Sequence, residues 1–273
     1  MLRGGALPRL IPVPALARGG LRIGGVTPFT SIDYPGKLSA AVFVQGCPWR
    51  CGYCHNPHLQ PRGEAAGPSW PEVRAWLRRR VGLIDAVVFS GGEPTVDPAL
   101  GAAMDEVRGL GFAVGLHTAG IYPRRLRALL SCLDWLGLDV KAPLGDDTLH
   151  DRVTGAAGGG EAVRESLRAL IDAGIAYEVR TTAHSSLLDD AALLRLASGV
   201  ARQGVTHYAL QLARPAGASG PTAPDYPART TIVRLQAMFE RFTLRGTPDL
   251  GHLDQAGGPA GPVSRANSMN ARR

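Results

Sequence analysis

Three cysteines, Cys47, Cys51 and Cys54, are spaced as C-x3-C-x2-C. They come directly after the apolar run 40–45, which predicts a strand, so we expect them on the loop at its C-terminal end. Three thiolates are one too few for a closed four-ligand metal site. They can instead hold three irons of a cubane iron–sulfur cluster and leave the fourth iron free to bind a small molecule. An open metal corner of this kind is suited to chemistry.

Two other metal sites are compatible with the same residues. A zinc ion could take His55 as a fourth ligand, although its adjacency to Cys54 strains simultaneous coordination. A closed electron-transfer cluster could use Cys132, although that residue lies far along the chain beside leucines, as a small buried side chain would. Clustered cysteines indicate a metal or cluster site in a reducing compartment, which favours a cytoplasmic protein.

The chain between the cysteine loop and residue 242 alternates β-rich runs with helical patterns, which predicts parallel strands joined by helical crossovers. The predicted strands are 40–45, 85–90, 112–117, 134–140, 175–182 and 205–212. The predicted helices are 70–81, 98–110, 123–131, 161–173, 189–203 and 229–242, and the stretch 145–160 is predicted as a loop. Six strand–helix units favour an α/β fold, a partial (β/α)6 TIM-like barrel. A doubly wound open sheet is the alternative.

Polar residues follow the predicted strands. Gly91, Gly92 and Glu93 come after the second strand, and Thr118 comes after the third. In a barrel these residues and the cysteine loop meet at one mouth, the face where reactive groups sit. Asp139 and Lys141 share one side of the fourth strand, where two buried charges need a partner or pair with each other. His184 ends the fifth strand and could face the same mouth.

The net charge of +7 gives little evidence for a nucleic-acid partner. Residues 1–22 contribute +4 and residues 251–273 contribute +2, which leaves +1 for the body of the 273-residue chain. No apolar run reaches the roughly 20 residues that span a bilayer, so we expect no membrane association. The composition predicts a flexible basic extension at 1–22, one domain at 23–245 and a disordered tail at 246–273.

Several longer motifs resemble glycyl-radical-enzyme activases of the radical S-adenosylmethionine (SAM) superfamily. The likeness covers roughly residues 23–215 and is strongest to activating proteins of anaerobic ribonucleoside-triphosphate reductase. The motifs that carry it are TSIDYPG (30–36), FVQGC (43–47), CGYCHNP (51–57), SGGEPT (90–95), DVK (139–141), RTT (180–182) and YALQ (208–211). Such breadth makes the resemblance more specific than a cysteine triplet alone.

The resemblance implies a role for each matching position. Cys47, Cys51 and Cys54 would ligate a [4Fe-4S] cluster, and the segment Gly91, Gly92 and Glu93 would take the amino group of SAM. The other positions expected near SAM are Tyr53, Asn56, Thr118, Asp139, Lys141 and His184. His117 stands where some relatives carry an acid, so a cation site supported by that acid is in doubt here.

The resemblance also implies the reaction. A reduced cluster would cleave SAM to methionine and a 5′-deoxyadenosyl radical, which would remove a hydrogen atom from a glycine Cα in a partner enzyme. The implied partners are a glycyl-radical enzyme, anaerobic ribonucleoside-triphosphate reductase, and a low-potential electron donor such as flavodoxin or ferredoxin. The alternatives are a radical SAM enzyme acting on a small molecule, similar to 7-carboxy-7-deazaguanine synthase, and a non-catalytic metal-binding module.

Overall fold

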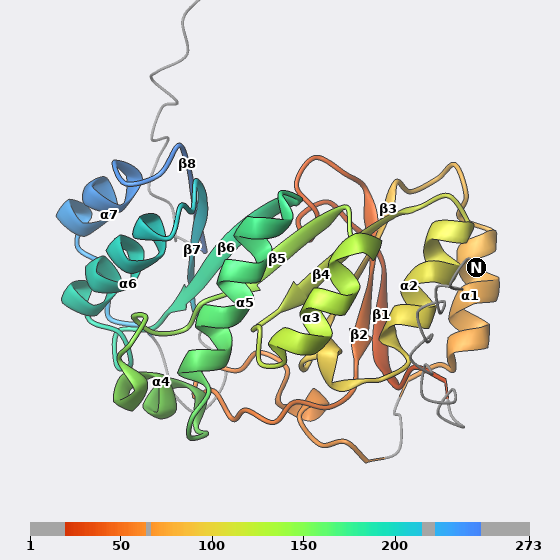
Figure 1. Cartoon of the computed structure of the whole chain (residues 1–273), viewed down its shortest axis with the longest axis horizontal. Helices are drawn as coiled ribbons and strands as arrows, with labels where there is room; N and C mark the ends of the chain where they lie inside the picture. The colour runs from red at the N-terminus through yellow and green to blue at the C-terminus, as the bar shows by residue number, and fades with distance from the viewer. Residues whose placement is uncertain (1–19, 64–66, 215–221, 247–273) are drawn as a thin grey trace, which may run out of the picture.

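The computed structural model describes residues 20–63, 67–214 and 222–246, and it contains one eight-stranded sheet (Figure 1). The strands are β1 (Ile23–Thr30), β2 (Ser39–Val44), β3 (Ala86–Gly91), β4 (Ala113–Thr118), β5 (Trp135–Asp139), β6 (Ala176–Ala183), β7 (His207–Leu212) and β8 (Arg241–Arg245). The helices are α1 (Trp70–Arg78), α2 (Leu100–Gly109), α3 (Pro123–Leu129), α4 (Asp147–Thr154), α5 (Gly160–Ala173), α6 (Asp190–Arg202) and α7 (Arg229–Gln236). Short 3-10 turns lie at Pro57–Leu59, Pro94–Val96 and Leu130–Cys132.

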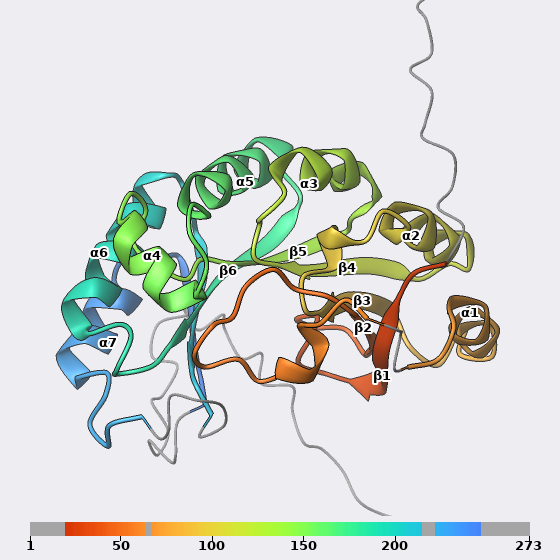
Figure 2. The same ribbon diagram turned by 90° about the horizontal axis from the view of Figure 1, so that it is seen from below.

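The sheet has the topology of a partial TIM barrel, as the sequence predicts. Its strands lie side by side in chain order from β1 to β8, and every pair from β2 onward is parallel. The crossover helices cover the convex side of the curved sheet (Figure 2). A doubly wound sheet reverses its strand order and carries helices on both faces. That alternative is therefore wrong for this chain.

Glycines follow two of the helices at the turns that lead to the next strands. Gly174 after α5 and Gly204 after α6 have φ angles of 64° and 88°. A residue with a side chain is strained in this left-handed region, whereas glycine enters it freely. The chain can therefore turn from helix to strand within two residues after α5 and four residues after α6.

Strand β1 was not predicted, and it pairs antiparallel with β2. The loop between these strands returns inside the barrel, where Tyr34 packs on Trp135 with ring centroids 5.3 Å apart. Ala86, Val88 and Trp135 complete a small interior cluster around Tyr34, separate from the larger core between sheet and helices. The loop thus fills the interior near the start of the strands.

Two predicted segments differ in the structure. The helix predicted at 229–242 ends at Gln236, and strand β8 follows at Arg241–Arg245. Phe239, just before β8, stacks on Tyr208 of β7 at 4.5 Å, and Arg245 of β8 forms two hydrogen bonds with Glu178 of β6. These tertiary contacts override the helical pattern of the sequence.

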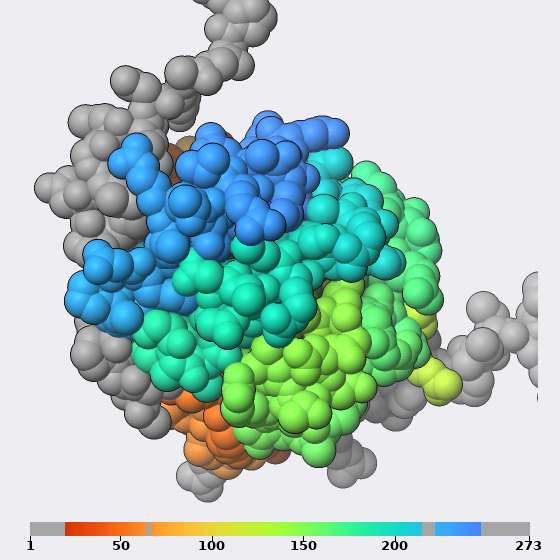
Figure 3. Space-filling model, turned by 90° about the vertical axis from the view of Figure 1, so that its left-hand side faces the viewer, coloured from red at the N-terminus to blue at the C-terminus, as the bar shows by residue number. Residues whose placement is uncertain are grey.

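The predicted loop 145–160 contains helix α4. The Asp146 carboxylate accepts a hydrogen bond from the Leu149 N–H at its start, and Gly155 ends it with a φ of 65°. The helix lies beside the segment that follows β2, which emerges below it in the space-filling view (Figure 3). No helix in the described ranges is both long and apolar enough to cross a membrane.

The predicted extension and the predicted tail lie almost entirely outside the described residues, whereas both boundaries of the predicted domain lie within them. Residues 1–19 and 247–273 are not described, so the flexible extension and the disordered tail stay predictions. Within the described part, Leu21 is buried, and the Arg22 N–H donates to the Asp97 carboxylate at 3.2 Å. The residues just before β1 therefore already contact the barrel.

Candidate functional site

A cavity of about 570 Å³ lies at the C-terminal ends of the parallel strands. It contains all but one of the residues that the sequence predicts for the site, which come from loops after four different strands. These are Cys47, Cys51, Tyr53, Cys54, Asn56, Gly91, Gly92, Glu93, Thr118, Asp139 and Lys141. Parallel strands in unbroken order bring these loops to one end of the barrel.

The cysteine loop is held by main-chain hydrogen bonds on both sides. The Cys47 N–H donates to the Gln60 carbonyl at 3.0 Å, and the Arg50 N–H donates to the Thr154 carbonyl at 2.7 Å. The second bond comes from the end of α4, where a Cβ at Gly155 would lie 2.9 Å from the Arg50 carbonyl oxygen. Helix α4, which was predicted as a loop, thus supports the thiols.

The thiols of this loop lie in a desolvated environment. Burial raises the pKa of Cys47 to about 11, against an opposing effect of hydrogen bonding at Trp49. Burial also raises the pKa of Cys51, although the nearby ammonium of Lys141 lowers it. Ligation to iron requires thiolates, so assembly of a cluster on this loop must release protons.

Gly91 and Gly92 allow the end of β3 to approach the end of β2. A Cβ on Gly92 would lie 2.4 Å from the Gly46 carbonyl oxygen, and a Cβ on Gly91 would lie 2.4 Å from the Val44 nitrogen. The close approach lets the Glu93 N–H donate to the Gly46 carbonyl at 2.9 Å. No residue with a side chain fits at either glycine without moving the segment that leads into the cysteines.

Glu93 is buried, and its carboxylate joins the loops after β3 and β4. One carboxylate oxygen accepts hydrogen bonds from the Thr95 N–H at 3.1 Å and from the Thr95 and Thr118 hydroxyls at 2.5 and 2.6 Å. The other accepts the Ala119 N–H at 2.8 Å. Burial raises the pKa of Glu93, whereas these donors lower it. The side chain therefore braces the site, and the adjoining main chain is left to meet a ligand.

Asp139 and Lys141 pair with each other, and Arg180 extends the pair. The Lys141 ammonium lies 3.3 Å from one Asp139 oxygen, and Arg180 Nε donates to the other at 2.8 Å. Burial opposes ionisation of Asp139, but Arg180 and Lys141 lower its pKa to about 2. The cluster therefore carries one net positive charge at neutral pH, beside the Tyr53 ring, whose centroid is 5.7 Å from the Lys141 nitrogen.

His117 also lines the cavity, and it is neutral. Burial lowers its pKa to about 3, with a further contribution from Arg180. Its Nε2 lies 2.8 Å from the Asp33 carbonyl oxygen, and its Nδ1 lies 3.3 Å from the Ser90 hydroxyl. The imidazole thus ties the loop between β1 and β2 to the end of β4.

The structure does not place His184 among the residues that line the cavity. The side chain is buried at the end of β6, and its Nδ1 lies 2.8 Å from the Ser186 hydroxyl and accepts the Ser186 N–H at 3.2 Å. The role near SAM expected for His184 therefore stays a prediction without support from its position.

Some lining residues were not predicted for the site. They include Arg180 and Thr182 of β6, Gln211 of β7 and Arg214 after it. Period-two alternation along β6 puts Arg180 and Thr182 on the same face of the sheet, which is the signal that could have found them. Gln211 faces the cavity because β7 pairs in register with β6, with Gln211 opposite Thr182.

The zinc alternative and the closed-cluster alternative find little support in the geometry. His55 Nε2 already accepts the Arg214 N–H at 3.2 Å. Cys132 does not line the cavity, and it is partly exposed instead of buried, with its Sγ 3.3 Å from an Asp105 oxygen. Across the described ranges, no three His, Cys, Asp or Glu side chains are arranged to hold a metal ion directly.

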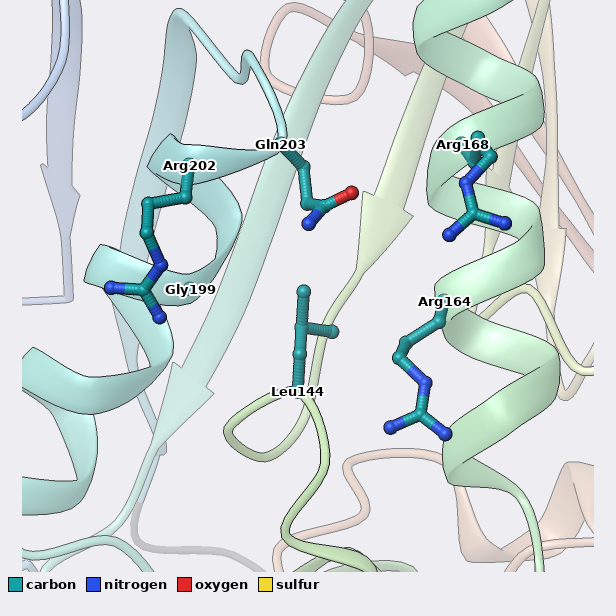
Figure 4. Close-up of a pocket in the computed structure, with 6 residues that line it drawn as sticks. All are labelled: Leu144, Arg164, Arg168, Gly199, Arg202 and Gln203. Carbon is teal, nitrogen blue, oxygen red and sulfur yellow. The ribbon is translucent and has the colours of Figure 1, made fainter.

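A second hollow lies outside the barrel between α5 and α6, with a volume of about 210 Å³ (Figure 4). Its lining residues are Leu144, Arg164, Arg168, Gly199, Arg202 and Gln203. None of them was predicted for the site, and two of the guanidinium groups already bind Glu161 and Ser198. We therefore assign the functional site to the larger cavity.

The sequence of the barrel matches a known family. Residues 41–190, more than half of the chain, match the family model for the radical SAM superfamily. The chain belongs to this superfamily. It is thus a radical SAM enzyme, and the family implies a [4Fe-4S] cluster and SAM as cofactors.

Curated relatives of this radical SAM enzyme include activating enzymes. A protein of Methanocaldococcus jannaschii described as a glycyl-radical enzyme activating enzyme is 27% identical over 178 residues, which cover 62% of this chain and 70% of the relative. A protein of Haemophilus influenzae with the same description is 30% identical over 120 residues, which cover 42% of this chain and 45% of the relative. The pyruvate formate-lyase-activating enzyme of Clostridium pasteurianum is 28% identical over 173 residues, which cover 62% of this chain and 71% of that enzyme.

Solved structures show the same fold. The crystal structure of Streptococcus suis SuiB bound to S-adenosylmethionine superposes with a TM-score of 0.59 at 13% identity, covering 74% of this chain and 48% of SuiB. A structure of TYW1 with a lysine-pyruvate adduct gives a TM-score of 0.53 at 17% identity, covering 73% and 72%. This radical SAM chain therefore spans about half the length of SuiB, and at these identities the likeness concerns the fold alone.

The cavity fits the cofactors that the superfamily implies. It brings together three thiols from one loop and a glycine-rich main chain that no Cβ could share. The Tyr53 hydroxyl is buried without a hydrogen-bond partner among the described residues, although Tyr53 lines the cavity. A buried hydroxyl of this kind normally has a partner, and a ligand with polar groups would supply one.

Proposed function

We propose that this chain activates a glycyl-radical enzyme by removing a hydrogen atom from the Cα of one glycine in that partner. The similarity to activating enzymes over 173 and 178 residues carries this proposal. The gathering of Cys47, Cys51 and Cys54 with the glycine segment in one cavity supports it. When both cofactors are bound, the cluster and SAM supply the one-electron reduction and the adenosyl-based hydrogen-atom abstraction.

The chain's own residues would bind and orient these groups. Cys47, Cys51 and Cys54 would provide the thiolates for the cluster. Main-chain carbonyl groups at Gly91 and Gly92 would accept hydrogen bonds from the ammonium of SAM, since carbonyl oxygens are the acceptors that an ammonium needs. Glu93 would hold these carbonyls in place through the loops that its carboxylate joins.

The remaining predicted residues would position the rest of SAM. The Lys141 ammonium suits a carboxylate, and its charge is only partly offset by Asp139, which Arg180 also contacts. We expect Tyr53 near the adenine and Asn56 near the nucleoside, with Thr118 close to the ligand and His184 less so. None of these roles requires a side-chain acid or base.

We further propose anaerobic ribonucleoside-triphosphate reductase as the partner enzyme. The motifs from Thr30 to Pro57 resemble activating proteins of that reductase more than other activases. A low-potential flavodoxin or ferredoxin in the cytoplasm would supply the electron. We propose residues 23–245 as the catalytic domain, with the segments 1–22 and 246–273 as appendages.

The test uses the full chain, reconstituted with iron and sulfide under anaerobic conditions and reduced in the presence of SAM. We expect 5′-deoxyadenosine as a product, and a glycine-centred doublet by electron paramagnetic resonance once the reductase is added. Product without the doublet would favour a radical SAM enzyme acting on a small molecule. Bound metal with no 5′-deoxyadenosine would favour a non-catalytic module and overturn the proposal.

A further inference from the structure

The polar side chains of the reaction cavity form two groups that differ in their hydrogen bonding. Those on β3, β4 and β5 contact one another, as in the Glu93 network and the pair of Asp139 and Lys141. On the β6 and β7 side, the Thr182 hydroxyl and the Gln211 amide line the cavity but have no hydrogen-bond partner within the described ranges. Both residues are only partly buried. The second group is therefore available to a ligand.

Thr182 and Gln211 are paired across β6 and β7, so their side chains leave neighbouring strands at the same level of the barrel. Adjacent strands lie about 4.8 Å apart, so both side chains can reach the same short stretch of a bound peptide. A carboxamide and a hydroxyl can each donate and accept a hydrogen bond. Together they match the alternating N–H and C=O groups of a polypeptide main chain.

The other end of the sheet contributes an apolar side to the same cavity. Phe29 on β1 and Ile32 in the loop after it both line the cavity, and they are 57% and 72% exposed. These two side chains therefore give the cavity an exposed apolar edge that a partner can contact. Apolar contacts from one end of the sheet and main-chain hydrogen bonds from the other fit a polypeptide better than a small polar molecule.

We propose that Gln211 and Thr182 hydrogen-bond the main chain of the partner segment that carries the target glycine, while Phe29 and Ile32 contact apolar side chains of that segment. This inference rests on the proposed function, because it specifies how the substrate of that reaction is held. The site recognises an extended polypeptide by its main chain. The target glycine has no side chain, so main-chain contacts are the ones that it can offer.

The experiment measures binding of a labelled peptide spanning the target glycine of the reductase to the anaerobically reconstituted full chain with SAM. Gln211→Leu keeps most of the side-chain volume but removes the amide, so we expect peptide affinity to fall about 3- to 10-fold, the usual loss for a hydrogen bond. Gln203→Leu is the matched control, because Gln203 lies outside the barrel in the hollow of Figure 4. It should bind the peptide like the wild type.

Peptides methylated at single main-chain nitrogens identify the contact. At one peptide position, methylation should weaken binding to the wild type by about the same factor as the Gln211→Leu substitution does. The same methylated peptide should bind Gln211→Leu no more weakly than the unmethylated peptide does, because the variant already lacks the hydrogen bond. Ile32→Ser should weaken binding of the native peptide but not of a peptide whose apolar residues next to the glycine are replaced by serine. Iron content and thermal unfolding of each variant show that the site is intact.

The outcomes separate this inference from the proposed function. A wild type that binds no peptide, or a Gln211→Leu variant with unchanged affinity and unchanged sensitivity to methylation, would overturn the inference. If the wild type still generates the glycine-centred doublet on the reductase, the activase function stands alone. If the wild type makes no doublet, the proposed function itself has failed.

Discussion

The Glu93 carboxylate accepts a hydrogen bond from the Thr118 hydroxyl at 2.6 Å, and this contact links the ends of two neighbouring strands, β3 and β4. The same carboxylate accepts the Ala119 N–H at 2.8 Å. The glycines before Glu93 touch the main chain at the start of the cysteine loop. The network therefore makes the shape of the glycine segment and the position of the thiols depend on each other.

Glu93→Gln should destabilise the protein. The carboxylate accepts all its hydrogen bonds, whereas an amide would turn one oxygen into an NH2 group that faces donors. A buried donor without an acceptor costs about 1–3 kcal/mol, so the free energy of unfolding should fall by that amount. Urea unfolding measures it, with Glu240→Gln at an exposed position as the control. Equal losses in the two variants would refute a bracing role for Glu93.

Gly92→Ala should impair assembly of the cluster, and Gly109→Ala should not. The new Cβ at position 92 would meet the Gly46 carbonyl oxygen at 2.4 Å and displace the segment before Cys47. At Gly109, in α2, a Cβ meets nothing within 4 Å, and alanine should stabilise the helix by up to about 1 kcal/mol. The measurement is the iron and sulfide content of each variant after reconstitution. Full occupancy in Gly92→Ala would show that the loop tolerates the shift.

Serine in place of Cys47, Cys51 or Cys54 should remove the cluster, while Cys132→Ser should keep it. Serine is a poor ligand for iron in these clusters, whereas at position 132 it retains a donor for Asp105. We expect each loop variant to lose visible absorbance and the formation of 5′-deoxyadenosine. Loss of absorbance in Cys132→Ser would instead point to a ligand role for that cysteine.

His117 should make the protein less stable as the pH falls. Burial lowers its pKa to about 3, and the unfolded value is about 6.5. Between these values the unfolded chain binds a proton that the folded chain does not, so stability rises with pH by up to about 1.4 kcal/mol per unit. His117→Gln keeps a donor for the Asp33 carbonyl and removes the titration.

Unfolding free energies of the wild type and His117→Gln at pH 6.5, 5.5 and 4.5 check this expectation. The difference between the two proteins should shift in favour of the variant as the pH falls. Comparison of the two cancels the contributions of other groups that titrate in the same window. Parallel curves would mean that folded His117 takes up a proton as readily as the unfolded chain does.

The order of the elements could be predicted from the sequence, because helical and strand periodicity are local properties. Six of the eight strands and six of the seven helices of the described chain fall at predicted places. Strand β8 could not be predicted, because it depends on contacts of Phe239 with Tyr208 and of Arg245 with Glu178, which are distant in sequence. Helix α4 was hidden in a stretch rich in glycine and alanine, although Asp146 and Gly155 cap its two ends.

Much of the candidate site was also visible in the sequence. The spacing of Cys47, Cys51 and Cys54 and the glycines before Glu93 are short motifs, and parallel strands necessarily bring the loops that follow them to one end of a barrel. The polar residues on β6 and β7 were missed, because alternation relates residues of one strand only. The register that sets Thr182 opposite Gln211, and the lack of partners for both side chains, are visible only in the structure.

The sequence by itself determined the identity of the potential ligands and the barrel that presents them, since both follow from residue types at fixed local spacing. Only the tertiary structure decided what each polar side chain does. It shows Glu93 bound by donors from two loops, Asp139 bound by Arg180 of the next strand, and His184 away from the cavity. Hydrogen bonds and burial depend on distances between residues far apart in the chain, and local pattern carries no information about those distances.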